Sequence, residues 1–195
     1  SGIQELREHS VLLKDGRELP ADCIILGTGF VTDPRIYMKS FPCKGLPGHD
    51  LMQDWKDGAE AYYGTTVTGY PNLFQLVGPN TGLGHNSIIF MIEAQVHYTL
   101  QCMKLLQQKG ADYLNVKPQA QRSFNEKLQA KFKGTVWQSG CTSWYQQADG
   151  RNVMLWPGST WRFWQQTRQV IEDDYAFTRC TNPLTQAVNA EVAAA

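Results

Sequence analysis

The residues best suited to chemistry lie in a glycine-containing loop that joins an apolar run to a helical pattern. This loop reads Gly82-Leu83-Gly84-His85-Asn86-Ser87. Loop amides and the partial positive charge at a helix N-terminus together favour the binding of a negatively charged group. Ser87 stands where a complete dinucleotide fingerprint would have its third glycine. A loop that merely turns the chain is therefore an equally good interpretation of these residues alone.

A second glycine pair, in Gly27-Thr28-Gly29-Phe30, follows another apolar run. Glycines allow a backbone to approach a ligand closely, but they also simply end strands. On the residues alone, the structural role is the favoured interpretation of this pair.

Other catalytic chemistry finds no support in the sequence. His85 and His97 lie far apart with no carboxylate at metal-ligand spacing, so we expect no metal site. Ser87, Ser139 and Ser143 lack the context of a nucleophile elbow. Five cysteines are present without a CxxC pair, which indicates reduced thiols. The catalytic residues stay unknown at this level.

Two kinds of element must position the glycine loops. The Asp15-Gly16 step between residues 11–13 and 17–19 predicts a hairpin. The nearly continuous apolar runs at 22–26 and 72–77 are typical of strands buried on both faces, and so of a parallel sheet.

Helical spacing follows the second run. Apolar residues recur from Asn86 or Ser87 until Gly110, and a second amphipathic helix is expected from Pro118 to Gly134. From 137 to 177 we expect short strands, turns and packed aromatic residues, and after 182 an Ala-rich tail without a packing signal.

Composition narrows the class of protein. The 195 residues carry 18 basic and 18 acidic side chains, so nucleic acid is not an expected partner. No apolar stretch is long enough for a membrane helix, and the first residues are too polar for a secretory signal. We therefore expect a cytoplasmic globular protein.

Several motifs in order resemble the Baeyer-Villiger branch of the flavin-containing monooxygenases. They are Asp22-Cys23-Ile24-Ile25-Leu26-Gly27-Thr28-Gly29-Phe30, Gly69-Tyr70-Pro71-Asn72-Leu73-Phe74, Gly78-Pro79, Ser143-Trp144-Tyr145, Gly150-Arg151-Asn152 and Leu155-Trp156-Pro157-Gly158. The resemblance covers about residues 10 to 177. This stretch is similar to the C-terminal part of the enzymes of that family.

The resemblance implies FAD and NADP as cofactors, and it assigns residues by position. Gly84, Asn86 and Ser87 would lie against the pyrimidine end of the isoalloxazine, and Ile88 would approach the substrate pocket. Thr28 and Gly29 would sit near the FAD. Trp144 matches a tryptophan on the loop that folds over bound NADP.

The same resemblance implies the reaction. In the complete enzyme, NADPH reduces FAD, and O2 supplies the oxygen that is inserted into a ketone or transferred to a soft heteroatom. The family's first GxGxxG loop, its signature motif and its active-site arginine are absent from this sequence. We therefore expect the chain to need a missing N-terminal half as its partner, and to be inactive alone.

The expected fold class is α/β: a partial FAD-binding Rossmann-like domain, with a parallel sheet and packed helices, plus an irregular C-terminal lobe. The expected divisions are 1–110, 111–181 and a disordered tail at 182–195. Two alternatives stay open. One is another flavin oxidoreductase with two dinucleotide folds; the other is a non-catalytic interaction module whose aromatic C-terminal third forms a binding surface, which exposed Trp137, Trp161 and Trp164 would favour.

Overall fold

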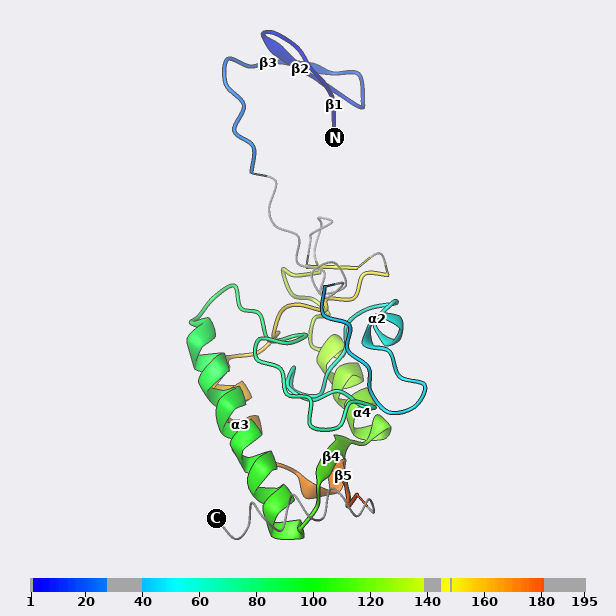
Figure 1. Cartoon of the computed structure of the whole chain (residues 1–195). Coiled ribbons are helices and arrows are strands. Elements are labelled where there is room, and N and C mark those ends of the chain that lie inside the picture. The colour runs from blue at the N-terminus through cyan, green and yellow to red at the C-terminus, as the bar shows by residue number, and fades with distance from the viewer. Residues whose placement is uncertain (1, 28–39, 139–144, 148, 181–195) are drawn as a thin grey trace. The chain divides into compact units, whose positions relative to one another are not determined.

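The computed structural model describes residues 2–27, 40–138, 145–147 and 149–180 (Figure 1). The chain divides into two compact units, Ser1–Val31 and Thr32–Ala195, and each is described here by itself. Within the described residues, no helix is both long enough and apolar enough to cross a membrane.

The first unit is a three-stranded antiparallel sheet in the order β1 (Ile3–Leu6), β2 (Ser10–Leu13), β3 (Glu18–Pro20). Strands β2 and β3 form the predicted hairpin, because Gly16 adopts the positive φ of 84° that its turn requires. Only β2 turns buried side chains, Val11 and Leu13, toward an interior.

The segment 22–27 forms no strand, so the parallel sheet expected there is not confirmed. Ile25 is 91% exposed and Leu26 is 72% exposed. A strand is stable only when a neighbouring strand pairs with its amides and carbonyls, and no described residue does so here.

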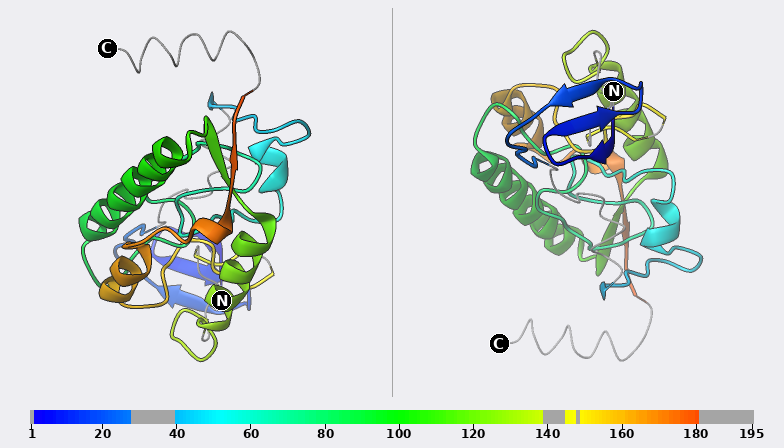
Figure 2. Two further views of the ribbon diagram at one scale, coloured as in Figure 1. Left: turned by 90° about the horizontal axis from the view of Figure 1, so that it is seen from below. Right: turned by 90° about the horizontal axis from the view of Figure 1, so that it is seen from above.

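The second unit is built around two helices with connecting loops between them (Figures 1 and 2). Helix α3 (Ile88–Lys109) begins after Ser87 and ends at Gly110, whose left-handed φ of 55° stops it as predicted. Helix α4 (Pro118–Ala130) starts at the expected proline but ends before Gly134. A short helix, α2 (Leu51–Asp54), is capped by the side chain of Asp50.

The C-terminal part holds an unexpected helix. Strands β4 (Tyr113–Val116) and β5 (Tyr175–Thr178) pair antiparallel, and η2 (Glu172–Asp174) precedes β5. Where short strands were expected, α5 (Thr160–Thr167) forms, because the Ser159 side chain accepts a hydrogen bond from the backbone N–H of Arg162. The fold is thus a mixture of helices and antiparallel strands.

One aromatic core joins these elements. Trp156, Phe163 and Tyr175 are buried in it together with residues of α3 and α4, so the aromatic C-terminal segment packs as expected. Trp137 and Trp164 pack half-buried against this core, while Trp161 is 56% exposed. The core contains residues from both sides of position 110, and the division expected there stays a prediction. The tail at 182–195 lies outside the described residues.

The second expected strand, at 72–77, is also missing. These residues run through turns and bends, held by bonds such as Gln75 N–H to Thr65 O at 2.8 Å. Leu76 and Val77 are about half exposed, at 50% and 44%. The segment has the composition of a buried strand but no neighbour to pair with among the described residues.

Candidate functional site

The N-terminus of α3 presents free hydrogen-bond donors at the end of the glycine loop. The first N–H groups of any helix have no intrahelical acceptor. Ser87 is the N-cap residue, but its side chain makes no capping bond, and the first turn holds no acidic residue. The positive end of a 22-residue helix is therefore neither capped nor neutralised by its own residues.

The predicted site residues of this loop lie together. Gly84, Asn86 and Ser87 are exposed, and Ile88 is half-buried. Asn86 donates from Nδ2 to Thr160 Oγ1 at 2.9 Å, and its Oδ1 accepts from the Ser87 N–H at 2.7 Å. Asn86 thus ties the start of α3 to the start of α5, which fixes the direction in which the helix points.

Gly84 lies directly beside an indole ring. A Cβ atom at this position would fall 2.7 Å from Cη2 of Trp137, a distance that real Cβ atoms do not show. Trp137 stands edge-on to Tyr145, with ring centroids 5.7 Å apart, and its carbonyl accepts from Gln146. A larger residue at position 84 would therefore require the Trp137 ring to move.

The segment that leads into the loop contains a strained residue. Val77 has a φ of 56°, a left-handed conformation that is costly for a β-branched side chain. Such strain persists where the surrounding structure enforces it. Here the Val77 N–H donates to Gln95 Oε1 of α3 at 2.9 Å.

Gln95 is a positioning residue that the sequence analysis did not identify. It is fully buried, and its Nε2 lies 3.0 Å from Gly64 O, 3.1 Å from Thr65 Oγ1 and 3.3 Å from Tyr63 O. The available signal was one glutamine on the otherwise apolar face of α3. Gln95 connects the helix to Val77, in the segment that leads into the loop.

Residues near the C-terminal end of the second unit hold the other side of the loop. Gly82 donates its N–H to Met154 O and accepts at its carbonyl from the Trp156 N–H, both at 2.8 Å. Asn80 Nδ2 donates to Asn152 O at 2.7 Å and to Leu155 O at 3.1 Å. Residues 152–156, which extend from one of the motifs quoted above into the next, therefore position the loop.

The interior behind α3 is uncharged. Burial raises the pKa of the Cys102 thiol to about 12. The Tyr98 and Tyr175 hydroxyls lie 2.9 Å apart, and burial raises the pKa of both. These groups keep their protons at neutral pH, so they do not offset the positive end of α3.

An open cavity of about 700 Å³ lies beside the beginning of the loop. Apolar side chains make up most of its lining, which includes Leu51, Trp55, Leu73, Gly78, Pro79, Gly82 and Met154. It does not include Gly84, Asn86, Ser87 or Ile88, so the helix start opens to solvent elsewhere.

Three predicted site residues cannot be placed. Thr28, Gly29 and Trp144 lie outside the described residues. The other four of the seven predicted site residues lie together at the start of α3: Gly84, Asn86, Ser87 and Ile88.

The arrangement fits one end of a flavin better than a whole FAD. Free amides at a helix start can stabilise negative charge on the ring system. A diphosphate needs its own glycine-rich cradle, and no complete GxGxxG loop exists in the sequence.

The fold is that of the flavin-dependent monooxygenases. A steroid monooxygenase bound to NADP superposes with a TM-score of 0.67 at 22% identity, over 91% of this chain and 34% of that chain. OTEMO in complex with FAD and NADP superposes with a TM-score of 0.67 at 22% identity, over 90% of this chain and 33% of that chain.

Sequence comparison narrows this class to one family. A Baeyer-Villiger monooxygenase of Pseudomonas aeruginosa is 46% identical over 96% of this chain and 35% of the relative. One from Streptomyces coelicolor is 41% identical over the whole chain and 37% of the relative. No family profile matches. The chain is homologous to Baeyer-Villiger monooxygenases and spans about a third of their length.

Proposed function

We propose that this chain supplies the pyrimidine end of a flavin site in an FAD- and NADPH-dependent monooxygenase of the Baeyer-Villiger type. The observation that carries the proposal is the uncapped, exposed N-terminus of α3, reached through a loop held on two sides. The homology to Baeyer-Villiger monooxygenases supports the assignment of the flavin.

A bound flavin would supply the redox chemistry: it would carry two electrons from NADPH to O2, so that one oxygen atom is added to a ketone or a soft heteroatom and the other is released as water. The chain's own residues bind and orient. The amides of the first turn of α3 would donate to the ring, with Gly84 and Ser87 alongside. Asn86 would hold the helix start in place through Thr160.

The remaining assignments rest on the resemblance to the family. Thr28 and Gly29 would lie near the FAD, Trp144 near the NADP, and Ile88 at the substrate pocket. We propose that the part of the relatives not represented here provides the diphosphate cradle. Its strands would pair with segments 22–26 and 72–77 into the parallel sheet of a Rossmann-like domain, so that the chain alone is inactive.

A chimera tests this function. In the Pseudomonas aeruginosa relative, the region that aligns with this chain is replaced by this chain. The chimera should retain FAD after desalting, read by visible absorption, and should consume NADPH with a ketone or sulfide. A folded chimera that retains no flavin would overturn the proposal. Stoichiometric flavin on the isolated chain would overturn the need for a second part.

A charge variant tests the site itself. Ser87→Asp in the chimera places a carboxylate at the helix start, where it opposes negative charge on the reduced flavin. We expect the flavin midpoint potential to fall by about 10–40 mV. Gln108→Asp, exposed near the other end of α3, is the matched control and should leave the potential unchanged. Equal shifts would remove α3 from the flavin site.

A further inference from the structure

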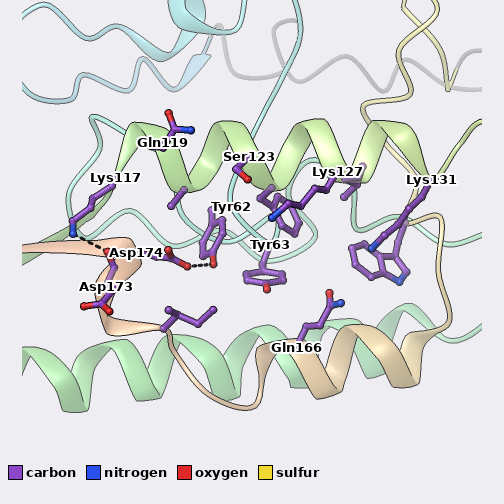
Figure 3. Close-up of a pocket in the computed structure, with 15 residues that line it drawn as sticks. Tyr62, Tyr63, Lys117, Gln119, Ser123, Lys127, Lys131, Gln166, Asp173 and Asp174 are labelled. Carbon is purple, nitrogen blue, oxygen red and sulfur yellow. Dashed lines mark hydrogen bonds between the residues drawn. The ribbon is translucent and has the colours of Figure 1, made fainter.

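A second cavity lies along one face of α4 (Figure 3). Its volume is about 630 Å³, which is within the usual range of small-molecule sites. None of the predicted cofactor residues lines it. The residues from α4 and its two caps recur at helical spacing: Lys117, Gln119, Ala120, Ser123, Phe124, Lys127, Leu128 and Lys131.

The floor of this cavity is a set of fixed aromatic rings. Tyr62 and Tyr63 both pack against Phe124, with ring centroids 5.3 Å and 4.6 Å apart. Trp156 is buried edge-on to Phe163, and its Nε1 donates to Ser159 O at 3.1 Å. Since these rings are already held by their neighbours, a ligand would lose little free energy in ordering them.

Charge is distributed unevenly along the cavity. At one end, Lys117 donates from Nζ to Asp173 O at 2.7 Å, and Tyr62 donates to the Asp174 carboxylate. Figure 3 shows Lys131 at the other end, with the Lys127 side chain between the two ends. No ion pair among the described residues involves Lys127 or Lys131. The acidic side chains of the cavity thus belong to the Lys117 end.

Lys131 is poorly compensated in this position. Its Nζ lies 5.5 Å from the centroid of the Trp156 ring. Burial lowers the pKa of Lys131, and the nearby Arg162 lowers it further. An anion in this end of the cavity would offset the cost of burying the Lys131 charge, because it would pair with the ammonium groups of Lys127 and Lys131.

We propose that this cavity binds a small carboxylate with an apolar, aromatic or aliphatic body. The body lies on the rings of Tyr62, Tyr63 and Phe124, and the carboxylate lies between Lys127 and Lys131. This binding requires no flavin and is independent of the function proposed above.

The test uses 4-phenylbutyrate as the probe and the 195-residue chain, with binding measured by calorimetry. Lys127→Met with Lys131→Met keeps the apolar stems but removes both charges. We expect this double variant to bind the probe at least about tenfold more weakly. Lys104→Met with Lys133→Met, at two exposed lysines outside the cavity, is the matched control and should bind normally.

A second measurement separates the charge from the apolar body. The neutral analogue 4-phenyl-1-butanol should bind the unchanged protein at least about tenfold more weakly than 4-phenylbutyrate. Circular dichroism checks that the variants are folded. Three outcomes would each overturn the proposal. The Lys127/Lys131 and Lys104/Lys133 double variants could bind the probe equally, the unchanged protein could bind the alcohol as well as the carboxylate, or it could fail to bind the carboxylate.

Discussion

At the scale of single residues, Gln95 holds the segment that leads into the candidate loop. Its buried amide bonds to Val77, Gly64 and Thr65, which are far apart in sequence from α3. It holds Val77 in a conformation that the valine side chain disfavours. Sequence patterns could not show this role, because all of the partners except the Thr65 hydroxyl are backbone groups, whose positions depend on the complete fold.

We predict that Gln95→Leu lowers the free energy of unfolding by about 2–4 kcal/mol, since buried polar groups lose their partners. Urea unfolding of the chain measures it. Gln107→Leu, exposed on the same helix, should change it by less than about 0.5 kcal/mol. Similar losses in the two variants would show that the Gln95 bonds contribute no specific stability.

At the scale of elements, α3 carries an apolar stripe that nothing in the described residues covers. Ile89, Val96, Leu100 and Met103 are between 40% and 57% exposed, although α3 otherwise packs into the core. The stripe recurs at helical spacing, as a buried face does. In a longer protein of this family it is available to pack against a further part.

We predict that the isolated chain self-associates through this stripe. Leu100→Glu with Met103→Lys removes two apolar residues at no net charge and should shift the chain toward monomer in light scattering. Gln107→Lys with Gln108→Glu adds the same charges at exposed polar positions and should leave the association unchanged. A chain that is monomeric throughout contradicts the prediction.

The elements also differ in how well the sequence predicts them. The hairpin and the extent of α3 follow from local spacing and from the Gly110 stop, because their hydrogen bonds close within the segment. The apolar runs at 22–26 and 72–77 have strand composition, but a strand takes its hydrogen bonds from a neighbour. Helix α5 was missed because aromatic residues obscured the Ser159 cap.

The candidate site followed the same division. Gly84 to Ile88 could be predicted from the glycine loop and the helix pattern. The contacts that hold this loop could not, since Trp137, Thr160 and residues 152–156 are more than fifty positions away in sequence.

At the scale of the whole molecule, the uncharged core makes stability sensitive to alkali. Burial raises the pKa of Cys102 to about 12 and raises those of Tyr98 and Tyr175. In the unfolded chain these groups ionise from about pH 8.5 for the thiol and about pH 10 for the phenols. Unfolding therefore releases protons above that pH, while below it the stabilisation is complete.

We predict that the free energy of unfolding falls as pH rises from about 8.5 toward 12, by up to about 1.4 kcal/mol per pH unit for each group. Urea unfolding across this range measures the slope. Tyr98→Phe removes one of the groups and should give a shallower slope. An unchanged slope in this variant would exclude Tyr98 as a source of the effect.

Trp156 connects two parts of the protein. Its backbone N–H bonds to Gly82 in the candidate loop, and its ring lines the cavity beneath Lys131. A ligand in the cavity would therefore contact a residue that also holds the candidate loop. Thermodynamic reciprocity sets the form of any coupling: whatever factor one ligand imposes on the affinity of the other is returned in equal measure. Trp156 is the residue at which that factor is to be measured.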